Sequence, residues 1–258
     1  MWLLDLGNTR LKLAWASSGG LGPVRAFAHA EAGFEAALDR ALAEPDGASA
    51  ARRQTGDTAW LASVAPGALC QRVEARLTAR GLRVERAATR AECAGVRIAY
   101  AEPARLGVDR FLALLAAHRR GGDWLLVSFG SAITLDLLDA AGRHRGGLIG
   151  ISPSHQREAL RERFPALDRG AGDPTPAFAV DTPDAVAAGA QRQALGFVLA
   201  AFGDASAELG RAPRLLLCGG DAAAVAPALA RRLGVEVEAH EALVLEGLQV
   251  YAETLERG

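Results

Sequence analysis

The sequence predicts an α/β protein built from two similar halves. Strand-like and helix-like segments alternate along most of its 258 residues, and this alternation is typical of a layered α/β architecture. A strand–turn–strand pattern at residues 3–15 reappears about half a chain later, at residues 125–136. Each copy consists of an apolar strand, a turn with glycine and short polar residues, and a second apolar strand. A duplicated domain accounts for both observations.

Hydrophobic spacing and helix-breaking residues place the elements of the first half. After the opening pattern we predict a strand at 23–29, a helix at 32–43, a polar loop at 44–57, a strand at 58–64, a helix from Pro66 to Gly81 and a strand at 82–85. Residues 94–110 lack regular spacing and contain glycine and proline, so we expect a surface loop before a helix at 111–118.

The second half follows the same order. We predict strands at 125–128, 133–138 and 143–151, a helix at 153–164, a loop at 168–176, a helix at 182–209, a strand at 214–218, a helix at 221–233, a strand at 235–238 and a helix at 242–255. Thr182 is expected to cap the long helix, which Gly203 would interrupt. The basic, glycine-containing stretch 119–123 separates the halves, so we predict domains at 1–120 and 121–258.

Composition indicates a soluble globular protein. Half of the residues are hydrophobic and the formal net charge is −1. No long basic run is interleaved with aromatic residues, so no nucleic-acid partner is expected. No run of consecutive apolar residues approaches the 18 of a membrane span, so none is expected. The first residues reach Asp5 without the pattern of a signal peptide, and we expect a cytoplasmic protein.

The cysteines and two isolated histidines show no metal-ligand spacing. Cys70, Cys93 and Cys218 are expected to be buried apolar side chains. His144 and His155 are expected at the surface.

Residues 5–12 have the composition of a phosphate-binding turn. Gly7 and Asn8 can adopt positive φ, and such a turn can expose consecutive backbone N–H groups to an anion. Asp5 could hold a hydrated Mg²⁺ beside the phosphate. Lys12 is the only lysine of the chain, and its compact ammonium suits a phosphate oxygen. An ordinary hairpin with a solvated lysine is the alternative.

Two later segments extend this pattern. Gly130 and Ser131 form the second turn, and a buried strand at 215–217 leads into the pair Gly219–Gly220. Phosphoryl transfer to an alcohol also requires a carboxylate that accepts the proton of the hydroxyl. Asp109 is the candidate, because it lies outside both turns, after a glycine and beside Arg110. A helix cap is the alternative role for Asp109.

Two strand–turn–strand loops followed by a strand and a glycine pair resemble the actin-like ATPase and sugar-kinase superfamily. The resemblance implies two duplicated ribonuclease-H-like (actin-like ATPase) domains with a cleft between them. Within that superfamily, Asp5-Leu6-Gly7-Asn8-Thr9 with Lys12, and Gly107-Val108-Asp109-Arg110, resemble the type III pantothenate kinases. This implies ATP-dependent phosphorylation of pantothenate to 4′-phosphopantothenate, the first step of coenzyme A biosynthesis, by a homodimer. A kinase for another small alcohol, and a regulatory protein that kept only the fold, are the alternatives.

The resemblance also assigns site residues. ATP contacts are expected from Asp5, Leu6, Gly7, Asn8, Thr9, Arg10, Leu11, Lys12, Ser131, Gly219 and Gly220. Pantothenate contacts are expected from Tyr100, Gly107, Val108, Asp109, Arg110 and Thr182. Asp109 is the expected base, and Asp5 the expected residue for the Mg²⁺ that accompanies ATP.

The chain departs from the family pattern in two places. The family's second loop usually carries an aspartate associated with a monovalent cation (K⁺ or NH₄⁺), and Ser128 occupies that position here. Because a hard anionic ligand is missing, we expect weak or absent K⁺ dependence. The family's Gly-Gly-x-Ile-x-Pro-Gly segment has altered spacing at Gly146–Ser154, so we expect a pocket of different shape there.

Overall fold

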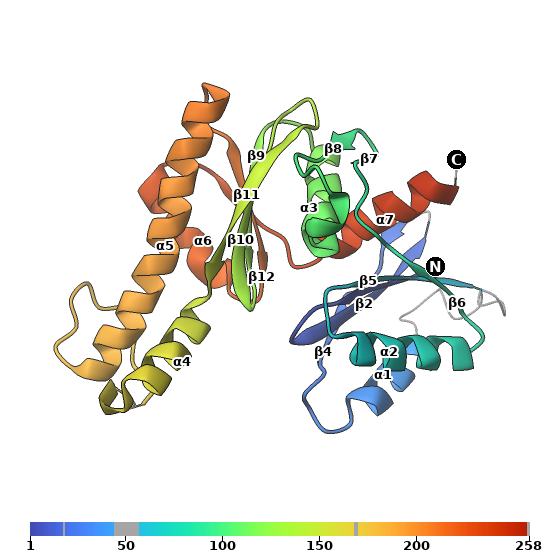
Figure 1. The fold of residues 1–258 in the computed structure, drawn as a ribbon, viewed down its shortest axis with the longest axis horizontal. Helices are drawn as coiled ribbons and strands as arrows, with labels where there is room; N and C mark the ends of the chain where they lie inside the picture. The colour runs from blue at the N-terminus through green and yellow to red at the C-terminus, as the bar shows by residue number, and fades with distance from the viewer. Residues whose placement is uncertain (18, 44–56, 168–169, 257–258) are drawn as a thin grey trace. The chain divides into compact units, whose positions relative to one another are not determined.

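The computed structural model describes residues 1–17, 19–43, 57–167 and 170–256 and divides the chain into two compact units. Unit 1 comprises Met1–Arg120, Ala141–Arg143 and Ala242–Gly258, and unit 2 comprises Gly121–Ala140 and His144–Glu241. The chain passes from unit 1 into unit 2 after Arg120, and both units are discontinuous along the chain. The C-terminal segment differs from the sequence expectation, because helix α7 (Leu243–Glu256) packs on helix α3 (Val108–Arg119) and joins unit 1 (Figure 1).

Unit 1 is a sheet with helices on both faces. Its strands are β1 (Trp2–Leu6), β2 (Arg10–Ser17), β3 (Gly20–Leu21), β4 (Arg25–Ala28), β5 (Thr58–Ser63) and β6 (Arg83–Arg86), in the order β3-β2-β1-β5-β6 with β4 on β2. Helices α1 (Phe34–Ala43) and α2 (Gly67–Ala79) pack on one face through Leu38 and Val73. On the other face, Trp60 of β5 contacts Tyr251 of α7. A hairpin, β7 (Glu92–Cys93) and β8 (Val96–Arg97), and a 3₁₀ turn at Pro103–Arg105 precede α3.

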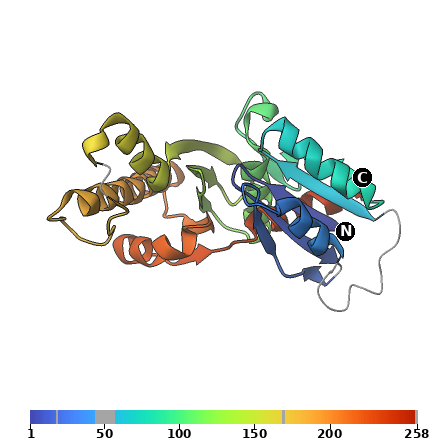
Figure 2. The same ribbon diagram turned by 90° about the horizontal axis from the view of Figure 1, so that it is seen from below.

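Unit 2 repeats this topology. Its strands are β9 (Trp124–Phe129), β10 (Ala132–Leu138), β11 (His144–Ile151), β12 (Arg214–Gly219) and β13 (Val237–Ala239), in the order β11-β10-β9-β12-β13. In both units the first strand pairs antiparallel with the second and parallel with the strand after the helical crossover. Helices α5 (Thr182–Leu209) and α6 (Ala222–Leu233) pack on one face of the sheet (Figure 2). The predicted duplication is therefore confirmed.

Several element boundaries differ from the sequence expectation. Helix α3 begins at Val108, three residues earlier than predicted. Asp181, not Thr182, caps α5, because its carboxylate accepts the backbone N–H of Asp184 at 3.1 Å. Helix α5 continues through Gly203, since Phe202 and Ala205 on either side of it are buried in the core. The loop predicted at 44–57 lies outside the described residues apart from Asp57.

Helix α5 is long and apolar enough, by length and composition alone, to cross a membrane. It has 28 residues and an 18-residue window with a mean hydropathy of 1.2. Arg192 interrupts the apolar run within this helix, so its sequence did not predict a membrane span. Leu195, Val198 and Phe202 belong to the core of unit 2, and a core helix of a soluble protein has the same composition.

The cysteines and histidines were predicted with mixed success. Cys70, Cys93 and Cys218 are buried thiols, as expected. His144 is also buried, and its Nε2 lies 2.9 Å from Oδ1 of Asp136. The surface location predicted for His144 was wrong, because its partner on β10 becomes visible only once the β10–β11 register is known.

Helix α4 (Pro153–Arg163) follows β11 and packs on α5, with a 3₁₀ turn at Pro165–Leu167 after it. Ser152 caps α4 by accepting the backbone N–H of His155. The segment Gly146–Ser154, which departs from the family pattern, thus spans the end of β11 and the start of α4.

Candidate functional site

The turn between β1 and β2 is tight and open to solvent. The N–H of Gly7 donates to the carbonyl oxygen of Arg10 at 3.0 Å, and Asn8, Thr9 and Arg10 are exposed. Neither Gly7 nor Asn8 has positive φ, so that expectation was wrong. Because the Gly7 N–H closes the turn, it is not available to an anion while this bond is made.

Asp5 lies in β1 directly opposite Lys12 of β2. Burial raises the pKa of the Asp5 carboxyl from 3.8 to about 7; the negative charge of Asp109 also raises it, and Lys12 acts in the opposite direction. The charge of Asp109 therefore acts on Asp5 within unit 1. Sequence reasoning missed this interaction, because nothing in the local pattern of either motif indicates it.

Asp109 occupies the first turn of α3. The N-cap residue of α3 is Gly107 and not Asp109. The helix-cap role considered for Asp109 was therefore wrong. Oδ1 of Asp109 accepts the backbone N–H of Arg110 at 2.9 Å. A Cβ atom on Gly107 would lie 2.6 Å from the same oxygen. Glycine at 107 thus leaves room for the carboxylate beside the positive end of the helix dipole.

Tyr100 and Arg110 form a pair beside Asp109. Arg110 is 7% exposed, and its Nη1 donates to the hydroxyl of Tyr100 at 3.4 Å. The guanidinium carbon lies 6.0 Å from the centre of the tyrosine ring. A buried guanidinium held by an aromatic ring suits a planar anion such as a carboxylate. Unit 1 therefore brings Tyr100, Gly107, Val108, Asp109 and Arg110 together.

Unit 2 carries a second, similar turn between β9 and β10. The N–H of Gly130 donates to the carbonyl oxygen of Ala132 at 3.1 Å, and Ser131 is exposed. Gly219 ends β12 opposite Phe129 of β9. Gly219 has a φ of +97°, and a Cβ there would lie 2.1 Å from the Phe129 carbonyl oxygen. The Gly219–Gly220 pair and the Ser131 turn thus share one edge of the sheet, at the carboxyl ends of parallel strands.

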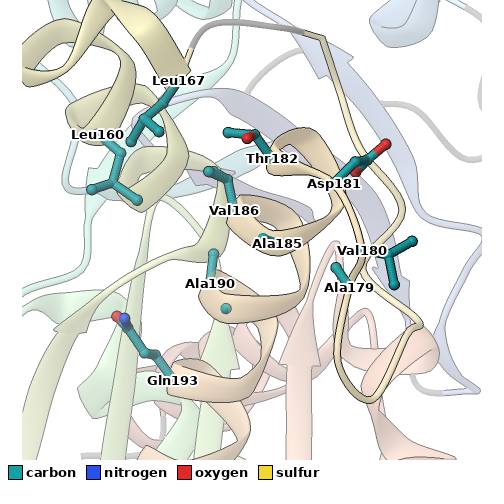
Figure 3. Close-up of a pocket in the computed structure, with 11 residues that line it drawn as sticks. Leu160, Leu167, Ala179, Val180, Asp181, Thr182, Ala185, Val186, Ala190 and Gln193 are labelled. Carbon is teal, nitrogen blue, oxygen red and sulfur yellow. The ribbon is translucent and has the colours of Figure 1, made fainter.

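Thr182 lies elsewhere in unit 2, as the first residue of α5. It lines an open hollow of about 500 Å³ with Leu160, Leu167 and Val186, and Figure 3 shows these side chains on the α4 side of the helix. Thr182 is half-buried. Thr182 therefore lies at an apolar hollow, and the residues that line this hollow do not include those of the glycine turns of unit 2.

The residues present fit a hydrated Mg²⁺ beside Asp5. Among the described residues, no three His, Cys, Asp or Glu side chains are clustered as a metal cage. Mg²⁺ in phosphoryl-transfer sites usually takes one or two carboxylates and fills its coordination with water and substrate phosphates. Asp5 supplies such a carboxylate, and a cation beside it would offset the burial and the charge of Asp109 that raise the pKa of Asp5.

Comparison with known proteins gives closely related chains. A family model described as type III pantothenate kinase matches residues 1–202. The chain is 42% identical over 251 residues to a type III pantothenate kinase of Stenotrophomonas maltophilia (strain R551-3). It is 43% identical to one of Xanthomonas oryzae pv. oryzae (strain PXO99A). Both alignments cover 97% of this chain and 96% of the relative.

Solved structures with lower identity share the fold. One is a protein of Campylobacter jejuni described as a conserved putative Baf family transcriptional activator, with a TM-score of 0.60, 18% identity and full coverage of both chains. Another is a ROK family glucokinase of Streptomyces griseus in complex with glucose and AMPPNP, with a TM-score of 0.53, 14% identity and 99% coverage of each chain. The fold is therefore that of the actin-like ATPases and sugar kinases, as the sequence predicted.

Proposed function

Since the chain belongs to the type III pantothenate kinase family and phosphorylates pantothenate with ATP in coenzyme A biosynthesis, we propose that Asp109 is the base of this reaction. The supporting observation is the position of its carboxylate in the first turn of α3, from where its negative charge acts on Asp5. Close relatives that align over nearly the full length carry the kinase name. The alternatives of another alcohol substrate or of a regulatory protein are not favoured.

The proposed reaction transfers one proton to Asp109 and replaces one P–O bond of the γ-phosphorus with another. Asp109 accepts the proton of the pantothenate hydroxyl as that oxygen attacks the γ-phosphorus of ATP. The bond between the γ-phosphorus and the bridging oxygen breaks, and ADP leaves with the electron pair. Asp5 would hold Mg²⁺, which supplies positive charge to the phosphates. The carboxylate of Asp109 lies in the first turn of α3, where the helix dipole favours negative charge.

We propose ATP contacts from both glycine turns, following the family resemblance. In unit 1, the exposed Asn8 and Thr9 and the ammonium of Lys12 would bind phosphate oxygens. In unit 2, the hydroxyl of Ser131 would contact phosphate, and Gly219–Gly220 would allow the nucleoside to approach the backbone. The close contact with Phe129 explains why residue 219 is glycine, and the place of the pair at the carboxyl end of a parallel strand supports the nucleotide role.

We propose that pantothenate binds beside the Tyr100–Arg110 pair. Pantothenate has a carboxylate, and the buried guanidinium of Arg110 suits it. Gly107 and Val108 form the adjoining backbone. Thr182 would contribute a hydroxyl, a role that is compatible with its place after the true cap residue, Asp181.

A homodimer in the cytoplasm is also proposed, and exposed apolar residues of unit 2 support the dimer. Phe178 is 95% and Val180 103% exposed, and Phe164 is 52% exposed. Phe178 and Val180 immediately precede α5, and Val180 borders the hollow beside it. Large apolar side chains that a monomer leaves in water are typical of a surface covered by a partner.

The Asp109→Asn variant tests the base assignment. The amide oxygen of asparagine can still accept the Arg110 N–H, so we expect the free energy of unfolding to change by no more than ~1 kcal/mol. Loss of a general base typically lowers the rate ~10²–10⁴-fold, so turnover with pantothenate should fall at least ~100-fold. ATP affinity, measured by calorimetry, should persist. A folded, ATP-binding variant with near-normal turnover would refute the assignment.

A further inference from the structure

Helix α3, which carries Asp109, belongs to unit 1 and is mostly buried. Arg110 and all residues from Phe111 to Ala117 are buried, so neighbours on every side determine where the helix lies. Its closest neighbour is α7, which lies beyond residue 202, where the match to the family model ends. The position of Asp109 therefore depends on a segment far along the chain.

The contact between α3 and α7 is made backbone to backbone at Gly247. A Cβ atom on Gly247 would lie 1.8 Å from the carbonyl oxygen of Leu112, and 2.4 Å from its carbonyl carbon. Leu112 is one helical turn beyond Asp109. Glycine within a helix is unfavourable relative to alanine, so its presence here is explained by the close approach.

Tyr251 continues the same face of α7, four residues after Gly247. It is 2% exposed, and its ring packs edge-to-face with Phe111 of α3 at 6.2 Å and with Trp60 of β5 at 5.7 Å. Its hydroxyl accepts hydrogen bonds from the backbone N–H of Ala88 and from Nε of Arg90, both at 3.3 Å. Tyr251 thus joins α3 to the sheet that carries Asp5.

We propose that Gly247 and Tyr251 are positioning residues for phosphoryl transfer. They hold α3 in place, so that Asp109 is correctly positioned relative to strand β1, which carries Asp5. The inference rests on the proposed role of Asp109 as the base. Neither residue touches the proposed substrates; both act through α3. A side chain at 247 would force the 1.8 Å contact apart to at least 3.0 Å, a shift of about 1 Å, and misplacement of that size can lower a rate by ~100-fold.

The test is a double-mutant cycle between Gly247→Ala and Asp109→Asn. We expect Gly247→Ala alone to lower kcat about 10- to 100-fold, with ADP affinity within about twofold of the natural protein. Because Gly247 acts through Asp109, adding Gly247→Ala to Asp109→Asn should lower kcat by less than about twofold further. Losses that multiply in the double variant would overturn the inference, as would normal kcat in Gly247→Ala. Near-normal turnover in Asp109→Asn would instead overturn the base assignment on which it rests.

Two controls separate positioning from stability. Gly203→Ala makes the same chemical change in the interior of α5, where nothing lies within 4 Å of the new Cβ, and should leave kcat unchanged. Val73→Ala destabilises unit 1 from the opposite face of its sheet and should also leave kcat of the folded protein unchanged. If the Gly247→Ala variant does not fold, the Tyr251→Phe variant tests the positioning role in its place. It keeps the ring and loses only the hydroxyl contacts, and it should lower kcat several-fold with unchanged ADP affinity, whereas unchanged kcat would refute the proposal.

Discussion

Burial makes the charged form of Asp5 unfavourable, so the stability of the protein should depend on pH. Its pKa is raised from 3.8 to about 7 by burial and by Asp109. The folded protein therefore holds this proton more tightly than the unfolded chain does, so the free energy of unfolding should fall as pH rises from about 4 to about 7. Asp5→Asn removes this loss, and it should stabilise the protein by about 1–4 kcal/mol at pH 8 and have little effect at pH 4.

Denaturant unfolding at both pH values without divalent cations measures this difference. The same variant should lose at least ~100-fold in turnover, since a metal ion contributes several kcal/mol of charge stabilisation. An Asp5→Asn protein that is less stable at pH 8, or that retains full activity, would contradict the role assigned to this carboxylate.

Ser128 predicts how the protein responds to monovalent cations. It lies in β9 between Thr134 of β10 and Cys218 of β12, where the family usually has an aspartate. Without that carboxylate, K⁺ should stimulate turnover weakly or not at all, and Ser128→Asp should increase the stimulation. Initial rates in K⁺ and in a bulky organic cation, at equal ionic strength, measure the effect. Strong K⁺ activation of the natural protein would show that other oxygens bind the cation.

At the scale of elements, two neighbouring residues at the start of α5 have different expected roles: Asp181 caps the helix, and Thr182 is the proposed substrate contact. Asp181 accepts the N–H of Asp184, so Asp181→Ala should lower the free energy of unfolding by about 1 kcal/mol. Thr182 is already helical, so Thr182→Ala should cost less stability but raise KM for pantothenate. If the assignment is correct, thermal unfolding shows the larger loss of stability in Asp181→Ala, and steady-state kinetics shows the larger rise in KM in Thr182→Ala. Equal loss of stability in both would return the cap role to Thr182.

Local pattern predicted most elements but not their ends. The strand–turn–strand segments were found because apolar alternation and glycine are local signals. The start of α3 was missed, because Gly107 and Val108 look like loop residues until the helix is packed. The cap of α5 was misassigned since Asp181 and Thr182 are both good caps, and only backbone geometry separates them. Positive φ at Gly7 was expected from residue type, but the turn closes through the Gly7 N–H instead.

At the scale of the whole molecule, the duplication was predictable and the return of α7 to unit 1 was not. Two copies of one motif in one chain indicate two copies of one fold. Nothing local marks Gly247 as a contact for Leu112, because the partner lies over a hundred residues earlier in the chain. The effect of the Asp109 charge on Asp5 was not predictable for the same reason. Long-range contacts of this kind depend on packing, and the motifs alone did not define the whole candidate site.

The exposed apolar residues before α5 predict how the protein assembles. Phe178 and Val180 are fully exposed beside the start of α5, and a stable interface buries about 800 Å² on each partner. If a second copy covers this surface, Phe178→Ser should shift the protein from dimer to monomer in analytical ultracentrifugation at micromolar concentration, and should raise KM for pantothenate. Ala75→Ser is the control: Ala75 is exposed on α2 of unit 1, and among the described residues the exposed large apolar side chains all belong to unit 2. It should remain dimeric. A natural protein that is monomeric and fully active would refute the dimer, and a dimer unaffected by Phe178→Ser would place the interface elsewhere.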